Sequence, residues 1–229
     1  MYTKNVKLRY RYQNIFSADS VSEINGGYNA IASELLIDRK LSIHSNAEDL
    51  DFVIHFGEAA NKTLDYACAY SLSSPLSIFI NIERSNLCDV KVIKRICDIS
   101  KRLELFGTEL VVEVTERDFC SKCTKVLEGL TYLKSKEVVL AKDDFDYLTL
   151  DFKSINTELA LFYEYVKIDV PLNFKEKVIF DDFVEAHYKT KKIIVEKIET
   201  KEQLKMLDLI KLWGVQGFLF CKGETISKI

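Results

Sequence analysis

Acidic side chains recur in this sequence at points where an apolar stretch ends. The clearest case is the adjacent pair Asp143 and Asp144, which follows the apolar run at 138–141 after a single lysine. Neighbouring carboxylates repel each other and lose hydration on burial, unless positive charge lies between them. Taken alone, the pair could simply begin a turn. Other polar residues stand at comparable points along the chain: Glu34, Asn81, Glu113, Lys167, Asp169, Glu196 and Gln216.

The donor atoms in this set indicate which ion they could hold. Apart from Lys167, they are carboxylate and carboxamide groups, and ligands of that kind favour hard cations such as Mg²⁺ or Mn²⁺ over zinc. Adjacent aspartates suggest two ions, because one carboxylate can bridge both metals while its neighbour binds only one. Two such ions close together form a clamp suited to phosphodiester hydrolysis.

The segments that would position these residues alternate between strand-like and helix-like patterns. Most of the strand-like segments are continuous apolar runs, which is typical of strands buried on both faces. They cover residues 8–16, 28–37, 76–82, 108–114, 137–142, 163–169, 192–197 and 215–220. The link between the first two is too short for a crossover helix, so we expect these two strands to be antiparallel.

Helical periodicity fills the intervals between the strands. Apolar residues recur at spacings of three and four in 89–106 and in 119–133, and segments 46–72 and 174–188 also look helical. Thr200 and Gln203 form a capping-box pair, which predicts a last helix that begins there and stops at Gly214.

Eight strands with helices between nearly all of them favour an α/β fold, namely a TIM-like (β/α)₈ barrel with an antiparallel first strand. We expect a single domain over 1–229. In such a barrel the carboxyl ends of the strands meet at one mouth, so the polar residues above would converge there. A doubly wound open sheet is the competing architecture, but no glycine-rich turn follows any strand, as a dinucleotide site or a P-loop would require.

Composition and charge exclude several classes of protein. The net charge is -3 and the basic residues are scattered, which gives no electrostatic footprint for long nucleic acid. The polar start and the absence of a long apolar run predict a cytoplasmic protein without a membrane partner. The six cysteines are expected to be free thiols, because disulfides are rare in cytosolic proteins. A structural zinc site is not expected, because the pair Cys120 and Cys123 has no second Cys or His pair at ligand spacing.

Motifs in order along nearly the whole chain resemble those of the EAL domain family. Members of this family are bacterial phosphodiesterases that open cyclic di-GMP to linear pGpG. The matching stretches are YQNI at 12–15, ELL at 34–36, INIERSNL at 80–87, VEVTE at 112–116, KDDF at 142–145, VKID at 166–169, VEKIET at 195–200 and QGFLF at 216–220. The family's barrel, with its antiparallel first pair of strands, agrees with the predicted fold.

The resemblance implies a role for each matching residue. Two divalent cations, Mg²⁺ or Mn²⁺, would be held, one by Glu34, Asn81, Glu113 and Asp143 and the other by Asp143, Asp144 and Glu196. Lys167 would contact the attacking water and the phosphate. The substrate, cyclic di-GMP, would be bound by Gln13, Leu36, Asp169 and Gln216. Glu116 would steady the loop after Asp144, and Glu199 would support the catalytic site from nearby.

Three departures from the family pattern keep two hypotheses open. The segment 146–150 lacks glycine, Asp38 stands where the family has a phosphate-binding arginine, with Arg39 one place on, and Lys197 replaces a glycine. The retained ligands favour an active, metal-dependent cyclic di-GMP phosphodiesterase. The departures favour a degenerate EAL-like protein that acts as a non-catalytic nucleotide sensor or a protein-interaction regulator. The resemblance leaves a homodimer and a regulatory protein partner open.

Overall fold

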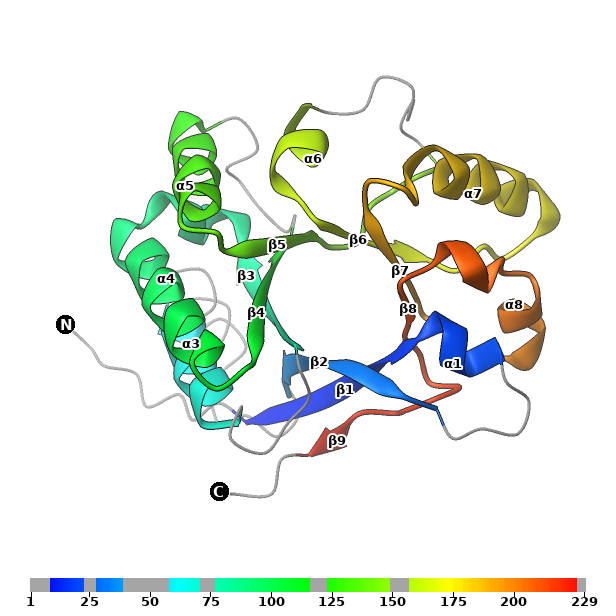
Figure 1. The fold of residues 1–229 in the computed structure, drawn as a ribbon, viewed down its shortest axis with the longest axis horizontal. Helices are drawn as coiled ribbons and strands as arrows, with labels where there is room; N and C mark the ends of the chain where they lie inside the picture. Colours follow the sequence, from blue (N-terminus) through cyan, green and yellow to red (C-terminus); the bar gives the residue numbers. More distant parts are fainter. Residues whose placement is uncertain are drawn as a thin grey trace, which may run out of the picture.

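The strands close into a barrel. The computed structural model describes residues 9–22, 28–38, 58–70, 77–115, 123–148 and 157–225. Its sheet has the strand order β2-β3-β4-β5-β6-β7-β8-β1-β9, and β2 also pairs with β1, which completes a ring of eight strands (Figure 1). The TIM-like (β/α)₈ barrel predicted from the sequence is therefore confirmed.

The first strand of the ring runs against its two neighbours, as expected. β1 is antiparallel to both β2 and β8, whereas each successive pair from β2 to β8 is parallel. The short β9 pairs with β1 beside the ring. The strands are β1 (Tyr10–Ser17), β2 (Ala30–Ile37), β3 (Ser77–Glu83), β4 (Glu109–Thr115), β5 (Val139–Lys142), β6 (Tyr165–Asp169), β7 (Lys192–Glu196), β8 (Gly214–Val215) and β9 (Glu224–Thr225).

The helices lie around the outside of the ring (Figure 1). They are α1 (Ala18–Ser22), α3 (Glu58–Tyr70), α4 (Val90–Glu104), α5 (Thr124–Ser135), α6 (Thr157–Phe162), α7 (Phe174–His187) and α8 (Lys201–Lys205), with 3₁₀ turns η2 (Arg84–Cys88) and η4 (Leu209–Lys211). The capping box of Thr200 and Gln203 is present at the start of α8. Among the described residues, no helix combines the length and apolar character needed to cross a bilayer.

Two elements were predicted too long. The strand expected at 215–220 ends at Val215, because the backbone of Gly217 is drawn into turn hydrogen bonds with the amides of Phe220 and Cys221. The helix expected to reach Gly214 ends at Lys205 and is followed by η4. Of the helix expected at 46–72, the structure describes 58–70, which is helical. The short elements α1, α6 and β9 were not predicted.

An apolar layer fills the barrel and forms the floor of its mouth. Seven strands each contribute one buried side chain to it: Ile15, Ala32, Phe79, Val111, Ala141, Tyr165 and Ile194. Side chains alternate between the two faces of a strand, so the residue two places nearer the mouth faces inward again. That second layer consists of Gln13, Glu34, Asn81, Glu113, Asp143, Lys167 and Glu196. The strand period thus places the predicted polar residues in one layer above an apolar floor.

Candidate active site

Lys167 lies at the centre of a group of buried acids, which we call the Lys167 cluster: Lys167, Glu34, Glu113, Asp143 and Glu196. Its ammonium is 3.0 Å from Oε2 of Glu34, 2.8 Å from Oε1 of Glu113 and 2.8 Å from Oε1 of Glu196. Oδ1 of Asp143 is 3.6 Å away. The lysine is only 1% exposed. One ammonium therefore faces four carboxyl groups in a place that water hardly reaches, and the cluster has an excess of acid.

Carboxamide groups complete the surroundings of Glu34. Nδ2 of Asn81 donates a hydrogen bond to Oε1 of Glu34 at 2.7 Å, and Nε2 of Gln216 donates to Oε2 at 2.8 Å. Gln13 stands opposite Glu34 in the pairing of β1 with β2, and its Oε1 is 3.4 Å from Nε2 of Gln216. Burial raises the pKa of Glu34, but Lys167 and the two amide donors outweigh it and lower the pKa to about 2.

The other acids of the Lys167 cluster are less well satisfied. Glu113 is fully buried, and apart from the ion pair of its Oε1 with Lys167 its carboxylate oxygens accept no hydrogen bond within the described part of the chain. Burial, reinforced by Glu34, raises the pKa of Glu113 well above its usual value. Burial also raises the pKa of Asp143, and it raises that of Glu196 to about 8 despite the nearby Lys167. Buried oxygens that lack a donor fit the ligand set of a hard cation.

Asp143 and Asp144 diverge at the end of β5. Asp144 has a left-handed backbone with φ 44°, and Asp143 is buried while Asp144 is exposed. One oxygen from each of Asp143, Asp144 and Glu196 can nevertheless be chosen so that all three lie within 4.8 Å of one another, close enough to hold one metal ion. The structure thus brings both aspartates to the barrel mouth, as the sequence predicts, but in different environments.

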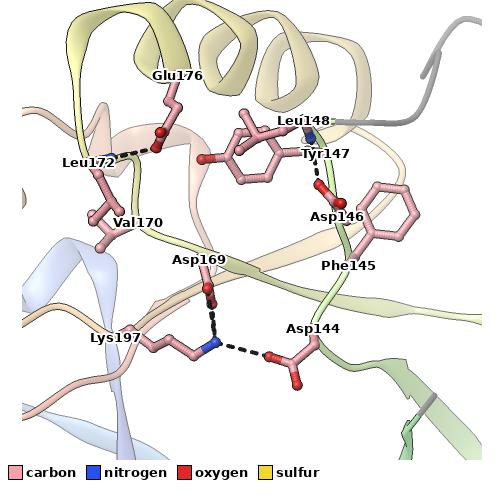
Figure 2. Close-up of a pocket in the computed structure, with 10 residues that line it drawn as sticks. All are labelled: Asp144, Phe145, Asp146, Tyr147, Leu148, Asp169, Val170, Leu172, Glu176 and Lys197. Atoms are coloured by element: carbon pink, nitrogen blue, oxygen red, sulfur yellow. Dashed lines mark hydrogen bonds and ion pairs between the residues drawn. The ribbon is translucent and has the colours of Figure 1, made fainter. Parts of the chain in front are cut away.

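A second lysine, Lys197, lies at the rim of the mouth. Its ammonium donates to Oδ1 of Asp144 at 3.1 Å and to Oδ2 of Asp169 at 2.8 Å (Figure 2). Sequence reasoning noted Lys197 only as a replacement for glycine and did not pair it with these acids. The signal available in the sequence was the replacement of a glycine directly after Glu196, because glycine often stands where the backbone is left-handed. The φ of Lys197 is 59°.

Three predicted site residues lie apart from the Lys167 cluster or outside the described residues. Leu36 is half-buried and pairs with Arg11 across the β1–β2 ladder, two places beyond Glu34 on the same face. Glu199 is exposed, and its backbone amide donates to Oε1 of Gln203 at 2.8 Å at the start of α8. Glu116 falls outside the residues that the structure describes, as does Arg39.

The family model of the EAL domain matches residues 45–223. The chain belongs to the EAL domain family. The match covers most of the polar layer, while Gln13, Glu34 and Leu36 precede the matched segment. Those three residues lie on β1 and β2, which pair with each other and are part of the same barrel.

One curated relative and two solved structures illustrate the family. The probable cyclic di-GMP phosphodiesterase PdeG of Escherichia coli (strain K12) is 26% identical over 166 residues, which are 69% of this chain and 32% of that protein. The chain thus spans about a third of the length of this relative. The PaMucR phosphodiesterase, in a c-di-GMP complex, has a TM-score of 0.73 at 22% identity, with 97% of this chain and 98% of that chain covered.

The second structure is that of Klebsiella pneumoniae BlrP1 in a calcium and cyclic di-GMP complex. Its TM-score is 0.72 at 18% identity, with 96% of this chain and 57% of that chain covered. At these identities the two structural matches support the EAL barrel fold.

The segment after the aspartates, which departs from the family pattern, is anchored by aromatic packing in this EAL domain. The rings of Phe145 and Phe183 lie 5.3 Å apart, and those of Tyr147 and Phe180 lie 5.6 Å apart, so the segment packs on α7. The amide of Phe145 also donates to the carbonyl of Lys167 at 3.0 Å. Aromatic contacts therefore position this segment without glycine.

Proposed function

We propose that this EAL domain is a metal-dependent phosphodiesterase that hydrolyses cyclic di-GMP to linear pGpG. The Lys167 cluster carries the proposal, because its four buried acids exceed what one lysine can neutralise. Glu113 also supports it, because among the described residues its buried carboxylate has no partner besides Lys167. The printed names of PdeG, PaMucR and BlrP1, which refer to cyclic di-GMP or to its phosphodiesterases, support the choice of substrate.

Two divalent cations, Mg²⁺ or Mn²⁺, fit the donors at the mouth. We assign Glu34, Asn81, Glu113 and Asp143 to one ion, and Asp143, Asp144 and Glu196 to the other, as the resemblance implies. When bound, such ions lower the pKa of a water molecule and neutralise charge on a phosphate. The calcium complex of BlrP1 supports a divalent cation in this family.

The chain's own residues would bind and orient the substrate. Gln13 and Leu36 lie on β1 and β2, Asp169 ends β6 and Gln216 directly follows β8, and we assign these four residues to nucleotide binding. Lys167 would donate to a phosphate oxygen and stabilise the charge that develops there. In the reaction, water oxygen forms a bond to phosphorus, the bond from phosphorus to the ribose 3′ oxygen breaks, and that oxygen leaves as a hydroxyl.

A nucleotide sensor that does not cleave its ligand is the second candidate function. It is favoured by the ion pairs that Lys197 forms with Asp144 and Asp169, since these occupy a proposed metal ligand and a proposed substrate residue. The acid at position 38 also lacks the positive charge that would attract phosphate.

Chromatography of cyclic di-GMP incubated with the protein and Mg²⁺ or Mn²⁺ separates these functions. The phosphodiesterase predicts linear pGpG, and predicts its loss in Glu113→Gln, which keeps the side-chain volume. Binding without product would establish the sensor, and no binding would favour a protein-interaction regulator.

The assignments of a single domain over 1–229, a cytoplasmic location, a homodimer and a regulatory protein partner remain proposals. Light scattering on the eluted protein tests the dimer, with twice the mass of the 26.4 kDa chain as the expected result.

A further inference from the structure

Lys197 is held in a conformation that lysine rarely adopts. Its backbone φ of 59° lies in the left-handed region, which residues other than glycine disfavour because of their Cβ. This conformation follows directly after β7, which ends at Glu196. It brings the ammonium to the two carboxylates, 3.1 Å from Asp144 and 2.8 Å from Asp169, as Figure 2 shows.

Asp144 is the point where this lysine meets the proposed metal site. The group that can hold an ion consists of Asp143, Asp144 and Glu196. Asp143 and Glu196 also face Lys167, whereas the ammonium that faces Asp144 comes from Lys197. A divalent ion and the Lys197 ammonium are therefore both attracted to the Asp144 carboxylate, and each lowers the attraction for the other.

We propose that Lys197 acts as a tethered cation that competes with the second divalent ion for Asp144. The proposal rests on the proposed function, because it takes the metal sites from there. It predicts two unequal sites: one held by the buried acids, and a weaker one at Asp144 that fills only when metal is abundant. The side chain of Lys197 is 58% exposed, so the ammonium can leave for water when an ion binds.

Exposure also sets the size of the effect. Ion pairs between exposed side chains contribute up to about 1 kcal/mol each, which corresponds to roughly a fivefold change in an equilibrium constant. With two carboxylates involved, removal of the charge should tighten the weaker site by about fivefold to tenfold. The site held by the buried acids should be unchanged.

Calorimetric titration of the purified protein with Mn²⁺ tests this. Lys197→Met keeps the length and the backbone cost of the side chain but removes its charge, and Lys197→Gly also removes the backbone cost. Both should tighten the weaker site equally. Lys177→Met, which breaks a partly exposed ion pair with Asp181 on α7, away from the proposed metal ligands, is the control and should leave both sites as in the wild type.

Unchanged affinity of the weaker site in Lys197→Met would overturn the proposal, as would the absence of Mn²⁺ binding in all variants. A gain in Lys197→Gly alone would show that the backbone, and not the charge, is responsible, which also overturns it. Failure of this proposal and failure of the proposed function can be told apart: a tightened site without cleavage of cyclic di-GMP would leave the competition intact and remove the hydrolase. Cleavage of cyclic di-GMP by a protein whose two metal affinities do not change in the Lys197 variants would support the hydrolase and overturn the competition.

Discussion

The barrel mouth contains two lysines that face carboxylates, and they differ in their exposure to water. Lys167 is 1% exposed and lies among four acids, whereas Lys197 is 58% exposed and bridges two. In a buried place charges attract strongly, but each has lost its hydration, so removing one leaves the others unsatisfied. At the rim, water and salt screen the same contacts. The two lysines therefore differ in what their removal should do.

The largest expected effect is that of Lys167→Met, which leaves the acids of the Lys167 cluster without their shared cation. Loss of one partner from a buried ion pair costs about 3 to 5 kcal/mol, so the free energy of unfolding should fall by about that amount. Loss of the ammonium at the phosphate should lower turnover by about a thousandfold. Urea unfolding and the pGpG assay measure the two effects.

Lys177→Met, which breaks a partly exposed pair with Asp181, is the control for that stability change and should cost about 1 kcal/mol at most. Equal losses in the two variants would contradict the contrast between buried and rim lysines.

Gly217→Ala should disturb the buried Lys167 cluster by shifting the backbone next to Gln216. A Cβ at Gly217 would lie 2.1 Å from the carbonyl oxygen of Ile198, so the segment that carries Gln216 would have to move. We expect a loss of about 3 kcal/mol in the free energy of unfolding. Gly107→Ala is the matched control: its φ of 72° is left-handed but a Cβ would meet nothing within 4 Å, so only about 1 kcal/mol should be lost. If Gly217→Ala were as stable as the control, the backbones of Gly217 and Ile198 would not be in close contact in the folded protein.

Asp38→Arg tests the charge beyond the end of β2. Asp38 is half-buried, and its backbone amide donates to the carbonyl of Arg9 at 2.8 Å. Exchange of a negative for a positive charge should tighten cyclic di-GMP binding by roughly fivefold, measured by calorimetry. Asp38→Asn, which removes one charge only, should lie between the two. Weaker binding in Asp38→Arg would mean that the side chain at 38 does not face the substrate.

Lys197→Met should have the smallest effect on stability. Its ion pairs are exposed, so the free energy of unfolding should fall by less than about 1 kcal/mol. That difference from the wild type should shrink in high salt, whereas the loss in Lys167→Met should persist. Urea unfolding at low and high salt measures both. A loss of unfolding free energy in Lys197→Met that did not depend on salt would mean that this lysine behaves like the buried Lys167.

Strand periodicity explains why the Lys167 cluster could be predicted from the sequence. Each of its members stands two places after an apolar residue of the floor, as Glu113 follows Val111 and Lys167 follows Tyr165. Such a pattern is local and can be read in each strand separately. The order of strands and helices then brings the members together at one mouth.

The features that sequence reasoning missed depend on backbone conformations outside the strands. Lys197 and its partner Asp144 are left-handed residues that follow β7 and β5, and no periodic pattern fixes where such a side chain points. The other partner, Asp169, ends β6. The strand expected at 215–220 stops early at the turn around Gly217, whose backbone also lies against that of Ile198, a contact between distant segments. The assignment of Glu199 to the site came from its motif and stays a prediction; the structure shows its backbone amide donating to Gln203 at the start of α8.

Anomalous diffraction from crystals grown with Mn²⁺ and a cyclic di-GMP analogue that resists hydrolysis tests the central claim most directly. We expect a strong manganese peak among Glu34, Glu113 and Asp143, with a weaker peak beside Asp144 and Glu196 that strengthens in Lys197→Met. Bound analogue with no manganese peak among those acids would contradict the account.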